Sequence, residues 1–506
     1  MRSLVLLACC AVLLPNRASA QTARADSTDP YVWLEEVHGE RAMAWVNAEN
    51  AKTTAVFEKD PRWQSIYSAA LKMAQAQDRL PYVSYIGGEL YNFWRDSAHV
   101  RGIWRKTSLA SYRTASPNWT TVLDLDALAK AENANWVFHG YTCQQPAEKR
   151  CLMFLSDGGE DASTIREFDL PSRSFVKGGF YLPKGKQQAA WTSQDTILVA
   201  REWNPGEVTS SGYAYIVKRL ARGQPLTAAV EIFRGSAKDG GYGVSPQTMV
   251  DAAGHRYSFI IRPTSTFEAE HYIVRPKDVA RLAIPEKGYF VDIIGGQVVV
   301  HLYEDWTTGG KTIRGGAVAA FDGTTALRTP NALTPVAIFE PGPRESVAGV
   351  SATKDKLLID IYQNVKGKVL VATRAPNGTW SHTTMKLPDN VSTNVVSTDT
   401  KTNDALVSVT GFLTPSSIWF ADAAGGTASE LKTLAPRFDA SASVVEQMEA
   451  TSKDGTKVPY FIVHPKSMAR DGSNPTILYA YGGFNASMTP RYDPDVGKLW
   501  VEQGGV

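Results

Sequence analysis

A long succession of short strands, residues 81–437, constrains the fold of this chain more than any other feature. Segments such as KDKLLIDIYQ (354–363) and NVKGKVLVATR (364–374) are rich in β-branched and apolar residues, and turn pairs such as Asn377-Gly378 separate them. This pattern predicts consecutive β-hairpins. The stretch is too long for one sandwich, whereas blades of roughly 40–50 residues would number seven or eight. We therefore expect a β-propeller, with one short helix near residues 124–131.

The residues before this stretch have a different pattern. Residues 29–79 predict helices, because Asp60 can cap a helix and Pro61 suits its first turn. Apolar side chains then recur at helical spacing, which is typical of a core-facing stripe. The stripe consists of Trp63, Ile66, Tyr67, Ala70 and Ala74.

The residues after the stretch predict the start of a mixed α/β domain. SVVEQMEATS (443–452) and KVPYFIVHP (457–465) predict two strands around a turn at Asp454-Gly455. NPTILYAYGGF (474–484) is almost wholly apolar up to its double glycine, which predicts a strand buried on both faces. A helix is expected at 494–503.

Composition excludes several classes of function. The 53 basic and 51 acidic residues leave a net charge of +2 with no long run of either sign, so no nucleic-acid partner is expected. The eight histidines show no HExxH or Cys/His ligand spacing, so no structural or catalytic metal is expected.

The first twenty residues predict an export signal. Arg2 supplies a positive charge, SLVLLACCAVLLP is apolar, and Ala18-Ser19-Ala20 provides small residues for cleavage. The apolar run is shorter than the roughly 20 residues that cross a bilayer, so no membrane anchor is expected. We expect a periplasmic or secreted protein that begins at Gln21.

Cleavage there would leave two cysteines, Cys143 and Cys151, on either side of a polar loop between two expected strands. An exported protein meets an oxidising compartment, which favours a disulfide between them. Two free thiols are the alternative.

Three segments resemble the prolyl oligopeptidase family of serine peptidases. They are DPYVWLEEVHGERAMAWVNAENAKT (29–53), TSKDGTKVPYFIVHP (451–465) and LYAYGGFNASMTPRY (478–492). The resemblance implies a seven-bladed propeller at 81–438 and an α/β-hydrolase peptidase domain that begins at 439–506. It also implies that the helices of residues 21–80 pack on that domain.

The resemblance further implies a function and two site residues. The family cleaves short peptides through a Ser-His-Asp acyl-enzyme mechanism without a cofactor, and the propeller restricts access. In the family's motif the second tyrosine donates to the oxyanion and the phenylalanine lines the proline pocket; these positions are Tyr481 and Phe484. An apolar ring favours cleavage after proline over cleavage after a basic residue. A monomer is expected.

The sequence departs from the family at the nucleophile. It contains no G-x-S-x-G, and the nearest matches, Gly243-Val244-Ser245 and Gly349-Val350-Ser351, lack the second glycine. We therefore expect the N-terminal part of a longer peptidase, without the catalytic triad and inactive as given. The alternative is a non-catalytic exported propeller that binds peptides or proteins.

Overall fold

A computed structural model describes residues 29–506 except Val37, Gly240 and Asn485. The predicted export signal at 1–20 lies outside the described residues. The chain divides into two compact units, one up to Ala74 and one from Gln75 to Val506, and each is described separately.

The first unit is helical, as predicted. It contains a short 3-10 helix, η1 (Val32–Glu35), and two α-helices, α1 (Glu40–Phe57) and α2 (Trp63–Ala74). Stacked aromatic rings join the two α-helices, since Phe57 lies 6.0 Å from Trp63. The predicted core stripe on α2 is wrong in this structure, because Ile66 and Tyr67 remain 42% and 51% exposed. A lone pair of helices has too few neighbours to enclose a stripe of that width.

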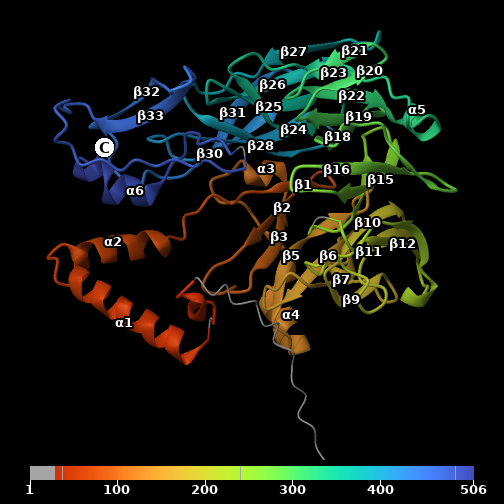
Figure 1. Cartoon of the computed structure of the whole chain (residues 1–506), viewed down its shortest axis with the longest axis horizontal. Coiled ribbons are helices and arrows are strands. Elements are labelled where there is room, and N and C mark those ends of the chain that lie inside the picture. The colour runs from red at the N-terminus through yellow and green to blue at the C-terminus, as the bar shows by residue number, and fades with distance from the viewer. Residues whose placement is uncertain (1–28, 37, 240, 485) are drawn as a thin grey trace, which may run out of the picture. The chain divides into compact units, whose positions relative to one another are not determined.

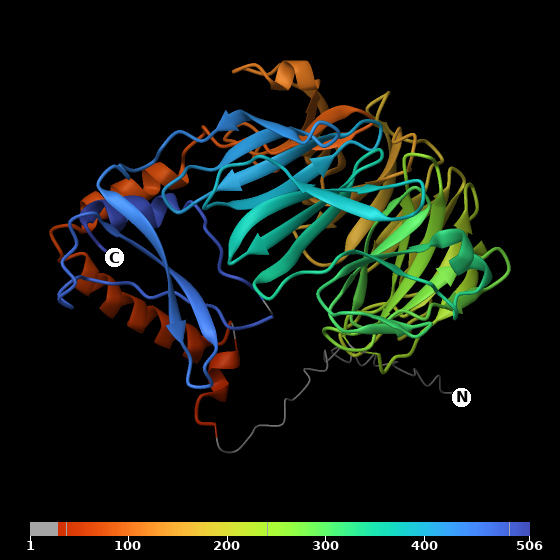
Figure 2. The same cartoon turned by 90° about the horizontal axis from the view of Figure 1, so that it is seen from above.

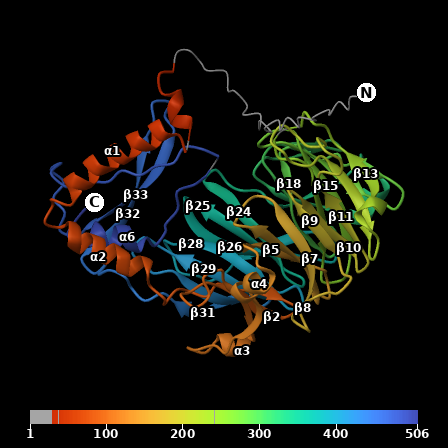
Figure 3. The ribbon, with the colours of Figure 1, turned by 90° about the horizontal axis from the view of Figure 1, so that it is seen from below.

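The second unit is built mainly from β-sheets. Between Ser84 and Thr433 the described residues form seven consecutive antiparallel sheets, which follow one another around a ring (Figures 1 and 3). The structure is therefore a seven-bladed β-propeller, as the resemblance implied. The strands are, blade by blade: β1 Ser84–Ile86, β2 Glu89–Trp94, β3 Ile103–Thr107, β4 Thr120–Asp124; β5 Trp136–Cys143, β6 Arg150–Asp157, β7 Ser163–Asp169, β8 Ser174–Phe175, β9 Tyr181–Gly185; β10 Gln188–Ser193, β11 Thr196–Ala200, β12 Ile216–Ala221, β13 Val230–Arg234; β14 Ser245–Val250, β15 Arg256–Pro263, β16 Ala269–Val274, β17 Val279–Arg281; β18 Gly288–Ile294, β19 Gln297–Leu302, β22 Val318–Asp322, β23 Val336–Phe339; β24 Glu345–Ala352, β25 Leu357–Gln363, β26 Lys366–Arg374, β27 Trp380–Thr384; β28 Ser392–Thr398, β29 Asp404–Thr410, β30 Ser417–Asp422, β31 Thr427–Thr433.

The core of the propeller lies between the blades. Among the described residues, each pair of neighbouring blades encloses one hydrophobic cluster, so both faces of every sheet are covered. This explains the apolar middle strands: in β11 (TILVA), Leu198 faces the fourth blade and Ile197 and Val199 face the second. Burial on both faces removes the need for strict polar alternation.

The first and seventh blades close the ring through contacts between their side chains, and no strand from one end of the chain completes the sheet at the other end. The first and seventh blades are each built from one continuous stretch of chain. Their contact contains Val83 and Leu90 from one side and Leu406 and Ile418 from the other. One hydrogen bond, from the amide of Tyr85 to the hydroxyl of Ser397, adds to it at 2.8 Å.

Short elements decorate the blades. The predicted helix near 124–131 is present as α4 (Leu125–Glu132), and Asp124 caps it through the amide of Ala127. Two further helices and a small hairpin were missed, because each is shorter than two helical turns or two full strands. They are α3 (Leu109–Tyr112), α5 (Gly323–Arg328) and the hairpin β20 (Trp306–Thr308) and β21 (Lys311–Ile313); a 3-10 helix, η2, spans Leu226–Ala228.

A C-terminal segment follows the last blade and lies beside the sixth and seventh blades (Figures 2 and 3). It begins with the predicted hairpin, β32 (Ser443–Thr451) and β33 (Lys457–Pro465), and Gly455 takes the left-handed turn position at φ 86°. The predicted helix is present as α6 (Pro494–Leu499), followed by η3 (Val501–Gln503).

The predicted buried strand at 474–484 is wrong in this structure. These residues have no strand assignment, and Leu478 and Tyr479 are 93% and 72% exposed. A strand forms only when a neighbouring strand accepts and donates its backbone hydrogen bonds. Among the described residues, β32 and β33 pair with each other and with no other strand. One contact has the predicted kind: Val506 donates its amide to Pro475 at 2.9 Å and accepts that of Ile477 at 2.9 Å. This is the hydrogen-bond pattern of two parallel strands.

Candidate active site

The stretch from Tyr481 to Phe484 is an exposed loop. Tyr481 is 50% exposed and Phe484 71% exposed. Glycine adopts a left-handed backbone most readily, but in this loop Phe484 adopts it, at φ 53°, and the two glycines before it do not. A non-glycine residue in that region costs on the order of 1–2 kcal/mol, which is typical of functional loops.

The glycines have a different role, which is to leave room for the phenol. A Cβ atom at Gly483 would lie 3.3 Å from the Tyr481 hydroxyl oxygen, closer than ordinary contact. The phenol therefore lies over its own glycine turn. A larger residue at position 483 would displace it.

Phe484 lies near the propeller. Its ring centroid is 6.1 Å from that of Phe267, in the loop between β15 and β16 of the fourth blade. Tyr289 of the fifth blade fixes this loop, because its hydroxyl donates to the backbone oxygen of Phe267 at 2.8 Å. The stretch thus places one aromatic ring against a propeller loop and leaves the other free.

Polar contacts attach the C-terminal segment to the sixth blade. Gln447 of β32 donates its amide to the backbone oxygen of Asn364 at 2.6 Å, in the turn between β25 and β26. Arg344 and Glu449 form an ion pair at 2.7 Å. Because both partners of that pair are partly exposed, it contributes at most about 1 kcal/mol.

Two further contacts attach the segment to the seventh blade. Phe412 and Phe461 approach to 5.2 Å between ring centroids. The amide of Tyr492 donates to the hydroxyl of Thr410 at 3.0 Å. Together these contacts hold the two ends of the segment that carries Tyr481.

No catalytic triad assembles within the residues that the structure describes. His139 contacts the hydroxyl of Ser163 at 3.1 Å, but no carboxylate holds its other nitrogen. His99 and His255 pair with Asp96 and Asp251, at 2.9 and 2.8 Å, without a serine.

The two partial G-x-S matches have structural roles. Ser351 lies inside β24, opposite Leu358. Ser245 begins β14, opposite Ile261. A serine that is paired within a β-sheet does not lie on the sharp strand-to-helix turn that exposes a nucleophilic serine.

The two cysteines meet in the second blade. Cys143 at the end of β5 is directly opposite Cys151 in β6, and the structure joins their sulfur atoms. The loop between them, residues 144–149, is thereby closed on itself. Cys143 also lines a cavity, described below.

The described part of the chain offers no group of three or more His, Cys, Asp or Glu side chains that could hold a metal ion. Within the same residues, no helix combines the length and the apolar character required to cross a membrane.

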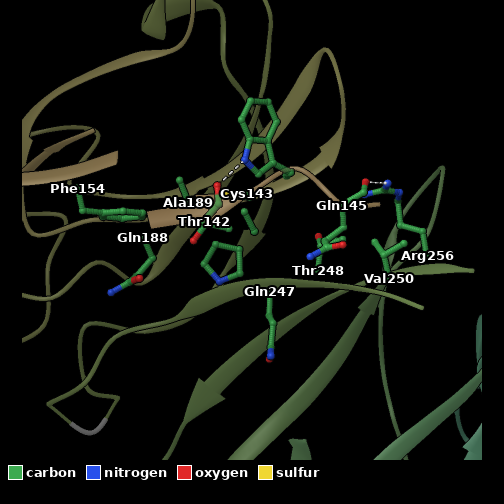
Figure 4. Close-up of a pocket in the computed structure, with 13 residues that line it drawn as sticks. Thr142, Cys143, Gln145, Phe154, Gln188, Ala189, Gln247, Thr248, Val250 and Arg256 are labelled. Carbon is green, nitrogen blue, oxygen red and sulfur yellow. Dashed lines mark hydrogen bonds between the residues drawn. The ribbon is translucent and has the colours of Figure 1, made fainter. Parts of the chain in front are cut away.

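A cavity of about 170 Å³ lies between the second, third and fourth blades. Its walls come mainly from β5, β10 and β14, the first strands of these blades. Figure 4 shows Arg256 and Gln145 at one end and Phe154 and Gln188 at the other. Sequence reasoning missed this site, because its residues come from three blades and have no shared motif.

A seven-bladed propeller of consecutive antiparallel sheets, followed by a segment that carries a Tyr-Gly-Gly-Phe loop, is the architecture that the resemblance implied. Residues 16–433 match the family profile described as "Prolyl oligopeptidase, N-terminal beta-propeller domain". The chain belongs to the prolyl oligopeptidase family.

The relatives are longer than this chain. An uncharacterized peptidase of Sinorhizobium fredii is 42% identical over 499 residues, which cover 97% of this chain and 68% of that protein. The solved post-proline cleaving enzyme of Rickettsia typhi is 28% identical with a TM-score of 0.83, over 94% of this chain and 70% of that one. Prolyl oligopeptidase B of Galerina marginata, solved with a 35mer substrate, is 18% identical with a TM-score of 0.71 and shares the fold; the match covers 92% of this chain and 66% of that one.

Proposed function

We propose that this chain forms the access-restricting propeller and the beginning of the α/β-hydrolase domain of an exported serine endopeptidase. The enzyme would cleave short peptides on the carboxyl side of proline through an acyl-enzyme. The serine, aspartate and histidine would belong to the part of the longer relatives that this chain does not match. The proposal needs no cofactor and treats the protein as a monomer.

One observation carries the proposal most directly, and it is the placement of Phe484. Its exposed ring approaches Phe267 of the propeller, while Tyr481 three residues earlier is 50% exposed. An apolar ring between two domains can pack on a proline side chain but cannot compensate a buried cation. The parallel pairing of Val506 with residues 475–477 supports the assignment of this segment to an α/β sheet.

The proposed mechanism gives the two aromatic residues different tasks. When the serine attacks the carbonyl carbon after proline, negative charge develops on the carbonyl oxygen. Tyr481 would donate its hydroxyl to that oxyanion, and the space left by Gly483 would let the phenol occupy that position before reaction. Phe484 would contact the proline ring in both the ground state and the transition state.

These tasks predict different kinetic defects in a form of the protein that carries the nucleophile. Tyr481→Phe keeps the ring and removes one donor, so kcat should fall by roughly 10²–10³ with KM little changed. Phe484→Ala removes apolar contact of about 1–3 kcal/mol, so the preference for proline over alanine should fall roughly 10- to 200-fold. Both are measured on matched peptides ending in proline or alanine before the scissile bond.

Tyr479→Phe is the matched control for the first variant, because Tyr479 is a more exposed tyrosine in the same loop. It should leave kcat unchanged. Full kcat in Tyr481→Phe would remove the phenol from the mechanism. Equal cleavage after many residue types by the unaltered enzyme would refute proline specificity and leave the family assignment intact.

A further inference from the structure

Arg256 gives the cavity between the second, third and fourth blades an unbalanced positive charge. It is the only ionisable side chain that lines the cavity, and within the described residues it makes no ion pair. Its Nη2 donates to the backbone oxygen of Gln145, whereas its Nη1 is shielded from solvent without a partner. Burial lowers the pKa of Arg256, which agrees with the absence of a nearby carboxylate.

A partly buried guanidinium without an anion is unfavourable, because its charge loses part of its hydration and gains little in return. The charge remains, since arginine does not lose its proton in proteins. A monoanion in the cavity would balance it. A phosphate dianion would leave a net negative charge in a partly apolar space, so a carboxylate fits better.

Part of the cavity wall is apolar. Trp191 is 3% exposed and Val250 9% exposed, and Pro246 belongs to the same lining. The indole N–H of Trp191 is already bonded to the backbone oxygen of Thr142 at 2.9 Å, so its ring presents only apolar surface. A cavity of 150 Å³ can hold a benzene molecule, so about 170 Å³ accommodates one small apolar side chain.

Two amide side chains other than that of Gln145 also line the cavity. Gln188 and Gln247 belong to the lining, and Figure 4 shows their amide ends directed away from Arg256. A primary amide offers both donors and an acceptor, which is the complement of a peptide group.

We propose that this cavity binds the C-terminal residue of a short peptide. Arg256 holds the terminal carboxylate, Trp191 and Pro246 contact a small apolar side chain such as proline, and Gln188 and Gln247 bond the preceding peptide group. The site is separate from the Tyr481–Phe484 loop and requires no bond cleavage. Its test is a binding measurement, so its outcome is independent of the proposed peptidase activity.

The test uses isothermal titration calorimetry of this chain with the tripeptide Ala-Ala-Pro as the free acid and as the C-terminal amide. A charge-assisted hydrogen bond contributes roughly 1.5–3 kcal/mol, so the acid should bind at least about tenfold more tightly. Arg256→Gln should abolish that preference. Arg256→Lys keeps the charge without the planar fork and should retain part of it.

Arg201→Gln is the matched control. Arg201 lies in the neighbouring third blade, burial also lowers its pKa, and it does not line the cavity. It should keep the full preference for the acid. Melting temperatures of all variants, followed by circular dichroism, establish that each variant is folded.

Three results would overturn the proposal. The first is equal affinity for acid and amide in the unaltered chain. The second is an undiminished preference for the acid over the amide in Arg256→Gln, or no such preference in a folded Arg256→Lys. The third is acetate binding as tightly as the tripeptide, which would make this an anion site that does not recognise peptides.

Discussion

The buried carboxyl group of Asp360 should make the stability of the propeller depend on pH. Asp360 lies in β25 of the sixth blade and is 3% exposed. One oxygen accepts the amide of Val395 in the seventh blade at 2.9 Å, and the other has no partner among the described residues. Burial raises the pKa of Asp360 from 3.8 to about 7, although the Val395 amide opposes this.

The sign of the effect follows from proton binding. In the folded protein Asp360 keeps its proton up to about pH 7, whereas in the unfolded chain it loses it near pH 3.8. Between these values the folded state binds more protons, so the free energy of unfolding falls as pH rises through that window. A shift of about three pKa units corresponds to on the order of 4 kcal/mol, all of it lost above the folded pKa.

Asp360→Asn removes this titration and keeps an oxygen to accept the Val395 amide. We expect its free energy of unfolding, relative to that of the unaltered chain, to rise by a few kcal/mol between pH 4 and pH 8. Urea unfolding followed by tryptophan fluorescence at several pH values measures this difference. Asp389→Asn, in an exposed loop before β28, is the control. The same pH dependence in Asp360→Asn and the unaltered chain would refute the reasoning.

Four further predictions concern other parts of the chain. Asp292→Asn should show a smaller version of the Asp360 effect in the same unfolding series, because burial raises the pKa of Asp292 only to about 6; a larger effect would contradict the burial argument. Exported protein should contain no free thiol when alkylated without reduction and weighed, because Cys143 and Cys151 are joined; two modified cysteines would show that the bridge does not form. N-terminal sequencing of exported protein should begin at Gln21, and a mature chain that retains Met1 would exclude cleavage. A fluorophosphonate probe should leave this chain unlabelled, because no histidine in the described residues holds both a serine and a carboxylate; stoichiometric labelling would reveal an activated serine.

Local patterns in the sequence were sufficient to predict most of the strands and one of the helices of the propeller. A strand's turn residues and apolar content lie within a few neighbouring positions, so the hairpins around Asn377-Gly378 and Asp454-Gly455 could be predicted directly. The helix at 125–132 was predictable for the same reason. The quoted terminal motifs identified the family, because they combine residues whose spacing is set within a single loop or helix start.

The segment 474–484 shows where such reasoning fails. Its composition predicts a buried strand, but burial and pairing depend on strands that lie elsewhere in the chain. Within the described residues only Val506 reaches it, and Leu478 remains exposed. The left-handed turn likewise falls on Phe484, although composition favours its glycines.

The sequence alone determined that the chain forms many short strands in consecutive hairpins, with helices before them and an α/β motif after them. Only the tertiary structure decided which blades share each hydrophobic cluster, that side chains close the ring, and that Arg256 shares a cavity with residues of two other blades. These properties depend on contacts between residues tens to hundreds of positions apart. The residues of one strand do not specify which other strand will cover its face. That contact is therefore defined only by the packing of the blades.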